Sequence, residues 1–448
     1  MEEAAKVEIV SKNTITPSSP TPSHLQHFKL SLLDQLAPRS FYVPVVLFFS
    51  SPSDDDLCFT KISQKLKSSL SQVLTLYYLF CGRFKGGKSN VHVDCNDQGA
   101  LYLEAKIPVK LSDFLKRNSK LNGIKLFLPL DPYNPKQEND QEHPYIMEVQ
   151  VTEFSCGSLA IGVCISHYIC DGATIASFLQ AWSKKAMKQL ENDAAADDFS
   201  PNMEASLLFQ AKEVEINTTS RVMGEKNIST RRFLFSDKSL QELRDKLISE
   251  DSYRQPTRVE AVTALIWKSA MEATGGACHH SLMSHAVNIR SRMVPPLPET
   301  TIGNLWQQAF SPLMEVDKSK EIKLKDLAMV VRETIKKIDK DYVTKLQGDA
   351  IGLFEVLKSL QEVKVLVMEK GVPCYSFSSW IRFGFYEVEF GFGKPIWVCT
   401  VGVPIRNVII LMPSKYEDGI EAWVTLNELH MTHFENNQQL LQFASFDY

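Results

Sequence analysis

His167 and Asp171 are the two residues of this chain whose types and spacing most strongly suggest chemistry. They occur in the run SHYICDG, which ends at Gly172. A neutral imidazole can take a proton from a hydroxyl or an amine, and a carboxylate one helical turn away can hold the ring, so the pair predicts a general base. Residues 159–165 are apolar and predict a buried strand, whereas residues 174–182 have the apolar period of a helix. His167 therefore falls between a strand and a helix, where α/β proteins often place ligands and chemistry.

From the residues alone, other interpretations of this pair stay open. An Asp-Gly step after a buried strand is also an ordinary turn, and a His-Asp pair can be purely structural. A metal site needs three or four ligands, and no such set accompanies His167 and Asp171 or the adjacent His279 and His280. We therefore predict no metal site. Cys164 is a poor candidate nucleophile because it lies within the apolar segment, where thiols are usually inert.

Length and composition indicate a globular protein of two domains. With 448 residues, the chain is too long for one ordinary core and fits two domains of roughly 200 residues. Its net charge of −4, without a long Lys/Arg block, argues against a nucleic-acid partner. No signal sequence or membrane-spanning apolar stretch is visible, and the nine cysteines have no Cys-x-x-Cys spacing. We therefore expect a cytoplasmic protein with reduced, mostly buried thiols and no membrane partner.

The pattern along the chain predicts an α/β protein with a break near its middle. Residues 1–190 alternate strand and helix patterns, with a helix over 61–80 and a hairpin over 146–166. Residues 191–224 are acidic and small at first and then lose any clear period, as in a crossover linker. Residues 225–448 resume the alternation, so we expect a second domain there.

Several elements of the second domain are predicted individually. A strand over 230–235 is followed by a helix that Ser236 caps and that ends near Leu247, and a further helix covers 258–273. Strands are expected over 286–289, 398–401, 408–412 and 422–426, and a closing helix is expected over 430–443.

The chain resembles the plant BAHD acyltransferases, which transfer an acyl group from coenzyme A to a hydroxyl or an amine. That family carries a His-x-x-x-Asp motif followed by Gly, matched by residues 167–172, and an Asp-Phe-Gly-Trp-Gly motif. The second motif appears here as Glu389-Phe390-Gly391-Phe392-Gly393, with two of its five positions changed. Shorter matching segments are spread over the chain: Pro17–Pro22, Leu30–Gln35, Gly82-Arg83, Arg290–Arg292, Pro295–Pro298, Gly303-Asn304 and Ser378–Trp380. The opening segment is most similar to the branch of the family that acylates alkaloid alcohols.

The resemblance implies both a fold and an activity. The implied fold is chloramphenicol acetyltransferase-like: two similarly folded domains with mixed sheets, and an active site in a channel at their interface. The implied activity is coenzyme A-dependent O-acylation, with acetyl-CoA as the leading donor, of a hydroxyl on an alkaloid or terpenoid. N-acylation, a larger donor such as benzoyl-CoA, and a non-catalytic ligand-binding relative are the alternatives. Acyl-CoA would be a co-substrate, no cofactor would be bound permanently, and we expect a monomer.

The resemblance also assigns a role to each residue of the first motif. His167 is expected to act as general base, without a covalent acyl-enzyme. Asp171 is expected to pair with an arginine of the second domain and so to dock the domains, instead of orienting the imidazole. Arg290 is the best match for that partner, and Arg292 is the second choice.

Further residues are expected around the substrates. Ser378 and Trp380 match a segment that lies near the reacting carbonyl in relatives, where a hydroxyl or an indole N–H stabilises an oxyanion. Asn304 is expected to face the acceptor pocket. For the phosphates of coenzyme A, the candidates are Thr257, Arg258 and Lys238, because two of them begin a predicted helix and a helix N-terminus attracts phosphate.

The second motif is expected to support the fold away from the chemistry, with its acidic residue held by an arginine. Gly391 and Gly393 match the family, whereas Glu389 adds a methylene and Phe392 loses the indole N–H donor. We therefore expect these two changes to affect local stability more than catalysis.

Overall fold

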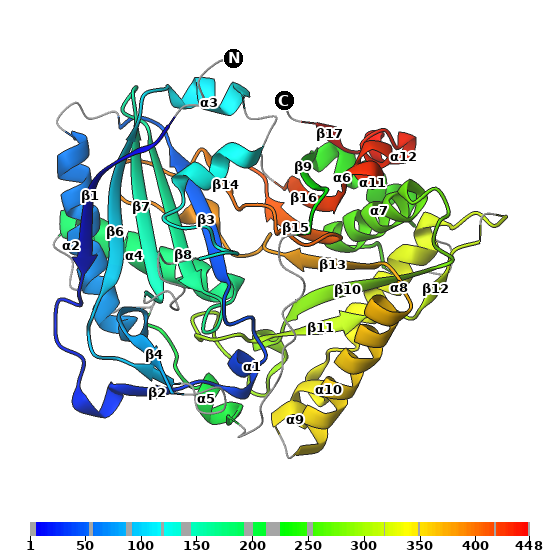
Figure 1. The fold of residues 1–448 in the computed structure, drawn as a ribbon, viewed down its shortest axis with the longest axis horizontal. Coiled ribbons are helices and arrows are strands. Elements are labelled where there is room, and N and C mark those ends of the chain that lie inside the picture. The colour runs from blue at the N-terminus through cyan, green and yellow to red at the C-terminus, as the bar shows by residue number, and fades with distance from the viewer. Residues whose placement is uncertain are drawn as a thin grey trace.

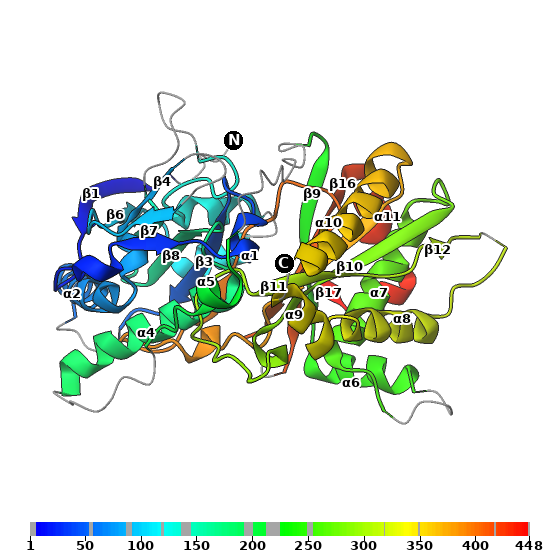
Figure 2. The ribbon, with the colours of Figure 1, turned by 90° about the horizontal axis from the view of Figure 1, so that it is seen from below.

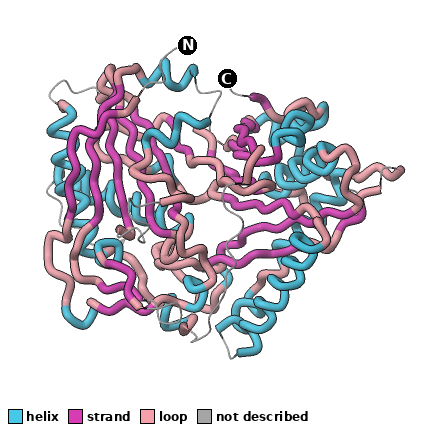
Figure 3. Tube along the Cα trace, in the orientation of Figure 1, coloured by secondary structure: helices cyan, strands magenta, loops and turns pink. Residues whose placement is uncertain are grey.

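The strands of the protein form two large sheets that lie side by side, with helices packed against both (Figure 1). Figure 3 shows the same separation, with helices around two groups of strands. Each sheet contains parallel and antiparallel pairs, which confirms the predicted α/β class with mixed sheets. The computed structural model describes residues 6–52, 57–86, 92–117, 121–135, 145–191, 200–211, 225–248, 254–317, 319–347, 350–415 and 418–446.

The first sheet has six strands in its described part. Across the sheet they are β1 (Glu8–Ile15), β6 (Ala100–Ile107), β7 (Met147–Phe154), β8 (Leu159–Ser166), β3 (Tyr42–Phe49) and β14 (Trp397–Cys399). All residues of β3 and β8 are buried, which explains why both read as unbroken apolar runs. The helices α2 (Phe59–Leu76) and α4 (Gly172–Glu191) pack together along one face of this sheet (Figure 2). The predicted hairpin is β7–β8, and the predicted early helix is α2, which ends four residues sooner than expected.

The second sheet has one more strand along its main path than the first. In order, the strands are β11 (Trp306–Phe310), β10 (His280–Asn288), β13 (Cys374–Ser379), β15 (Val408–Pro413), β16 (Ile420–Asn427), β9 (Ile228–Phe235) and β17 (Ser445–Phe446), while β12 (Met314–Glu315) pairs with β10. Figure 2 shows α7 (Arg258–Ala273) and α8 (Leu324–Lys336) on one side of the sheet and α10 (Ala350–Lys364) on the other. As predicted, Ser236 caps a helix, α6 (Asp237–Lys246).

The single closing helix predicted over 430–443 is wrong. The chain forms two short helices instead, α11 (Glu428–Phe434) and α12 (Gln438–Leu441). Asn437 caps α12 by accepting from a backbone N–H of its first turn at 2.9 Å. Asparagine side chains compete for backbone hydrogen bonds, so the consecutive Asn436 and Asn437 favour a break over a continuous helix.

The remaining elements are short or flank those above. They are α1 (Leu32–Gln35), α3 (Leu111–Arg117), α5 (Ala205–Leu208), α9 (Lys340–Gln347) and a small sheet of β2 (His27–Lys29), β5 (His92–Asp94) and β4 (Arg83–Lys85).

One stretch of the C-terminal half belongs to the core of the first sheet. β14 pairs with β3, and Phe385, Phe390 and Val398 are buried within the first core. The chain therefore leaves the second sheet after β13, crosses to the first, and returns at β15. The predicted linker lies partly outside the described residues, at 192–199 and 212–224, so the division into domains by sequence range stays a prediction.

The molecule has two halves, one built around each large sheet. A third apolar cluster joins these two halves beside the predicted site. Leu32 and Leu33 of α1 pack in one cluster with Ile289 and Leu305 of the second half. This contact fixes α1 against the segment that follows β10. It thereby carries the buried side chain of Asp34 to the interface.

Candidate active site

His167 lies in a short turn between β8 and α4, at the interface of the two halves. Its backbone N–H donates to Phe41 O at 2.7 Å, and its ring centroid lies 6.3 Å from that of Trp306. The expectation of one helical turn between His167 and Asp171 is wrong, because α4 begins only at Gly172. The two side chains therefore do not share a helix face, and each has a partner of its own.

The imidazole is held by Asn304. His167 Nδ1 lies 3.0 Å from Asn304 Oδ1, while Asn304 Nδ2 donates to His167 O at 2.8 Å and to Asp34 Oδ1 at 3.0 Å. Both acceptors of Nδ2 are oxygens that cannot donate, so the amide orientation follows from its surroundings. Asn304 Oδ1 can only accept, and His167 must therefore carry its hydrogen on Nδ1. The lone pair then lies on Nε2.

Asp34 anchors this arrangement from α1. Its two oxygens accept from the backbone and hydroxyl of Ser31 at 3.0 and 2.6 Å, and from the backbone of Asn304 at 2.8 Å. Burial raises the pKa of Asp34, and the hydrogen bonds from Ser31 and Asn304 oppose that rise. The carboxyl group thus links the cap of α1 to the residue that holds His167.

Burial also lowers the pKa of His167, although its hydrogen bonds and the charge of Asp171 act in the opposite direction. A lowered pKa keeps the imidazole neutral at physiological pH, which is the form a general base requires. Burial also acts on His285, a second histidine beside the cavity, and lowers its pKa to about 4. Its ring lies nearly parallel to Phe377 at 9°.

Asp171 forms a buried, two-pronged ion pair with Arg290. The Arg290 guanidinium donates to the two carboxylate oxygens at 2.8 and 3.0 Å, and its side chain is fully buried. Asp171 also accepts from the backbone of Thr174 at 2.8 Å and of Leu305 at 3.0 Å. The pair joins the start of α4 to the turn after β10, and so ties the two halves together. Arg292 has different partners, because it donates to Ile335 O at 2.9 Å.

Two glycines near the site occupy positions where a side chain would be crowded or strained. A Cβ on Gly172 would lie 2.7 Å from the Phe383 ring and 3.2 Å from the Trp380 ring. Gly303 has a φ of 128°, a conformation that side chains rarely adopt, directly before Asn304.

Ser378 and Trp380 lie together at the end of β13. The Trp380 indole N–H donates to Ser378 Oγ at 3.1 Å, and Trp380 is buried in the first core. Since the indole hydrogen is used on Ser378, the group left to donate toward a substrate is the serine hydroxyl. Trp380 thus orients Ser378 instead of reaching the substrate with its own N–H.

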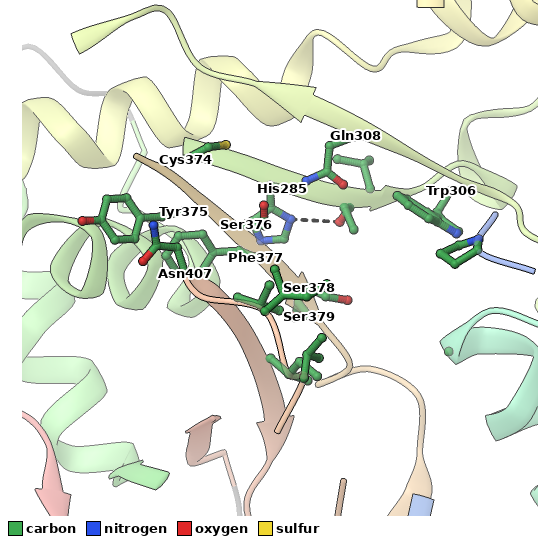
Figure 4. A pocket seen from close by; sticks show the side chains of 18 of the residues that line it. His285, Trp306, Gln308, Cys374, Tyr375, Ser376, Phe377, Ser378, Ser379 and Asn407 are labelled. Atoms are coloured by element: carbon green, nitrogen blue, oxygen red, sulfur yellow. Dashed lines mark hydrogen bonds between the residues drawn. The ribbon is translucent and has the colours of Figure 1, made fainter. Parts of the chain in front are cut away.

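A large cavity of about 2280 Å³ runs between the two halves. His167, Trp306 and Ser378 line it, and so do Thr257 and Arg258 at the start of α7. Figure 4 shows part of this cavity, with Trp306, Gln308, Ser376 and Ser378 among the side chains that line it. Typical ligand pockets measure roughly 300–1,000 Å³, so two substrates fit here at once. Asn304 does not line the cavity, because it is buried behind His167.

The comparisons with known proteins agree with this geometry. The model of the Transferase family matches residues 5–441. The chain belongs to this family, the BAHD acyltransferases. It is 34% identical over 433 residues to stemmadenine O-acetyltransferase of Catharanthus roseus, covering 96% of each chain, and 34% identical over 466 residues to a limonoid 7-O-acetyltransferase of Citrus sinensis, covering 98% of each. The crystal structure of vinorine synthase superposes with a TM-score of 0.83 at 32% identity, covering 99% of both chains.

As a BAHD acyltransferase, the protein uses a coenzyme A thioester, and the three candidates for its phosphates differ in position. Lys238 lies on α6 outside the cavity, with 88% of its side chain exposed, so we leave it out of the coenzyme site. Thr257 caps α7, and its hydroxyl accepts from Glu260 N at 3.2 Å. Arg258 lies at the cavity and pairs with Asp418 at 2.5 Å. Of these three candidates, Arg258 is therefore the one that offers a charge at the cavity for an incoming phosphate.

The second motif of this BAHD acyltransferase lies against the first core, away from His167. Phe390 is buried against Trp182, with ring centroids 4.9 Å apart, and Phe392 contacts Phe49 at 5.1 Å. Gly391 and Gly393 have φ values of 87° and 99°, which explains both glycines. The motif residues 389–393 do not line the cavity. The expected arginine partner of the motif's acidic residue is absent among the ion pairs of the described residues.

Three residues or elements of the site were not predicted. Asp34 carried a signal, since it is a carboxylate within an apolar run and forms a capping box with Ser31. Trp306 and α10, which both line the cavity, had no distinguishing pattern. Only the pairing of distant strands brings Trp306 to His167.

The remaining predictions concern metals, thiols and membranes. No group of three or more His, Cys, Asp or Glu side chains suited to a metal occurs in the part of the chain that the structure describes. All nine cysteines are free thiols, and burial raises the pKa of Cys164 and Cys170 well above its ordinary value. No helix of the described residues is long and apolar enough to cross a membrane.

Proposed function

We propose that this protein catalyses coenzyme A-dependent O-acylation of a hydroxyl group on a plant alkaloid or terpenoid, with acetyl-CoA as donor. The observation that carries the proposal is the hydrogen bond between His167 Nδ1 and Asn304 Oδ1 at 3.0 Å. It leaves the Nε2 lone pair of a neutral imidazole available in a cavity large enough for a thioester and an alcohol. Relatives named for the acetylation of an alkaloid and of a limonoid support the choice of acceptor.

The reaction needs one base and no covalent intermediate. Nε2 of His167 takes the proton of the acceptor hydroxyl while that oxygen attacks the thioester carbonyl carbon. The resulting tetrahedral intermediate collapses, the carbon–sulfur bond breaks, and the imidazolium returns the proton to the departing coenzyme A thiolate. Holding both reactants in one cavity supplies much of the rate acceleration.

Ser378 is our candidate for stabilising the oxyanion. Its oxygen already accepts from Trp380, so its own hydrogen is free for a developing negative charge. Arg258 is our candidate for a coenzyme phosphate. Asp171 and Arg290 act at a distance from the reacting atoms, by fixing the turn that carries His167.

Alternative substrates fit the same chemistry. An amine can replace the hydroxyl at the base, and the cavity volume of about 2280 Å³ also accommodates benzoyl-CoA. We further propose that the enzyme acts as a cytoplasmic monomer, which size-exclusion chromatography and imaging of a tagged protein would test.

A substrate panel tests the proposal directly. Purified protein is incubated with acetyl-CoA or benzoyl-CoA and a set of alkaloid and terpenoid alcohols and amines. Free thiol and product mass are then measured. We expect O-acetylated products and faster thiol release than with His167→Ala. Products formed only from amines, or only from benzoyl-CoA, would replace the proposed acceptor or donor. Acyl-CoA binding without any product would indicate a ligand-binding relative.

A further inference from the structure

Three polar side chains of the second sheet form a short chain of hydrogen bonds on the wall of the cavity. Gln308 Nε2 donates to Ser284 Oγ at 2.6 Å, and Ser284 Oγ donates to Ser376 Oγ at 3.0 Å. The three residues come from adjacent strands, since β10 lies between β11 and β13. Gln308 and Ser376 line the cavity (Figure 4). Ser284, which hydrogen bonds to both, is fully buried. We call these three residues the serine relay.

The direction of these bonds leaves the Ser376 hydroxyl able to donate to a ligand. Ser284 has a single hydroxyl hydrogen, which it gives to Ser376 while it accepts from Gln308. Ser376 accepts from Ser284, and among the described residues no acceptor is recorded for its own hydrogen. Successive hydrogen bonds polarise one another, so the Ser376 hydroxyl is a strengthened donor at the cavity surface.

The serine relay lies on the far side of the reacting centre from the proposed coenzyme site. β13 runs from Cys374 to Ser379, parallel to β15, and the turn that follows β15 carries Asp418, the partner of Arg258. Arg258 therefore marks the C-terminal ends of these strands. Ser376 lies two residues before Ser378, roughly 7 Å in the opposite direction.

A second strand leads from the reacting centre to the same place. On β11, Trp306 lies beside His167, and Gln308 follows two residues later on the same face of the strand. The space between Trp306 and Ser376 is thus where an alcohol bound at His167 would extend. A group on that alcohol about one ring system away from its reacting hydroxyl would meet the serine relay.

We propose that the serine relay binds a second oxygen atom of the acceptor, which makes the preferred substrate a polycyclic alcohol with a carbonyl or hydroxyl oxygen across its rings. This inference rests on the proposed function, because it takes His167 and Ser378 as the reacting centre. Ser376 donates to the second oxygen, and Gln308 and Ser284 position that hydroxyl.

Two matched alcohols test the inference. Decalin-2-ol has one hydroxyl, and 6-hydroxydecalin-2-one has the same rings with a ketone at the opposite end. With acetyl-CoA as donor, Ser376→Ala should lower the ratio of kcat/KM for the hydroxyketone over the plain alcohol by about tenfold, the effect of one neutral hydrogen bond. Ser376→Thr keeps a hydroxyl and should retain the ratio.

The control variant is Gln361→Ala, because Gln361 lines the same cavity from α10 and takes no part in the relay. It should retain the wild-type ratio. An unchanged ratio in Ser376→Ala, with acetyl transfer to both alcohols continuing, would overturn the recognition site and leave the proposed function intact.

A binding measurement keeps the two proposals separable. The Kd values of both alcohols, measured by quenching of tryptophan fluorescence, report recognition without turnover. If the wild-type protein acetylates neither alcohol, the proposed function is at fault. In that case, loss of the preference in Kd for the hydroxyketone in Ser376→Ala would support the recognition site, and an unchanged preference would contradict it.

Discussion

The two ring nitrogens of His167 have separate tasks in this structure. Nδ1 is fixed by Asn304, which is in turn held by Asp34, while Nε2 is the atom that meets the substrate in the proposed reaction. The triad of serine proteases also uses a partner at one nitrogen to set the tautomer of the other, but there the partner is a carboxylate. Here the partner of Nδ1 is the neutral amide of Asn304.

Replacing His167 with Ala should lower kcat for acyl transfer by about two to four orders of magnitude, the usual contribution of a general base. The side chain lies at the cavity, so the fold should persist. Turnover is measured by thiol release, with circular dichroism and thermal unfolding as controls for folding. Near-normal turnover in a folded variant would rule His167 out as the base.

The pH dependence of kcat/KM should follow the neutral form of His167. Burial lowers the pKa of this imidazole, so activity should rise with pH, and the midpoint of that rise should lie below the ordinary histidine value of about 6.5. Acid therefore reduces activity only as the pH falls through that lowered pKa.

Asn304→Ala provides the comparison for this pH profile. The hydrogen bond that His167 donates to Asn304 raises the pKa of His167, so its loss should move the acidic limb to still lower pH and reduce the plateau. A limb that moves to higher pH would contradict the assignment of this limb to His167.

At the scale of elements, the sequence predicted most of what positions the site. The strand before His167, the helix after it and the capped helix at Arg258 all follow from local patterns. The prediction of a single closing helix was wrong because Asn437 caps a new helix, α12, although the apolar period of the sequence continues through it. Trp306 and Gln308 could not be placed, since the register of β11 on β10 depends on contacts between distant residues.

The ion pair between Asp171 and Arg290 connects two such elements, the start of α4 and the turn after β10. Asp171→Ala should destabilise the protein by about 3–5 kcal/mol, because it leaves the buried guanidinium charged and unpaired. It should also reduce activity, since Asp171 holds the segment that follows His167.

A double-mutant cycle on thermal or denaturant unfolding measures this coupling. Asp171→Ala and Arg290→Ala together should cost less than the sum of the single changes, because contacting residues are not additive. Arg292→Ala is the matched control, as its guanidinium bonds to Ile335 O, and it should add independently to Asp171→Ala. Additive costs for Arg290 itself would remove the pair as the link between the halves.

At the scale of the whole molecule, the two halves are not independent bodies. The segment from Phe385 to Cys399 leaves the second sheet and completes the core and the edge of the first. No local pattern could have indicated this crossing, because β14 looks like any short apolar strand. The altered family motif lies within this segment, so its changes act on the connection between the halves and not on the cavity.

Restoring the family residues in that motif should therefore change stability more than chemistry. Phe392 is partly buried, with its ring 5.1 Å from Phe49 and 6.0 Å from Phe390, so Phe392→Trp places a larger ring in a packed site. Overpacking of this kind costs about 1–3 kcal/mol, and we expect a lower Tm. Glu389→Asp should have little effect on Tm, since no ion pair of Glu389 is recorded among the described residues.

The control is Phe354→Trp, because Phe354 is 65% exposed on α10 and the larger ring can extend into solvent there. Its Tm should match the wild type. For Phe392→Trp, kcat/KM with acetyl-CoA should stay near the wild-type value while Tm falls, because the motif does not line the cavity. A changed preference between acetyl-CoA and benzoyl-CoA at an unchanged Tm would contradict this, since it would require the motif to act on the substrate channel and not on the connection between the halves.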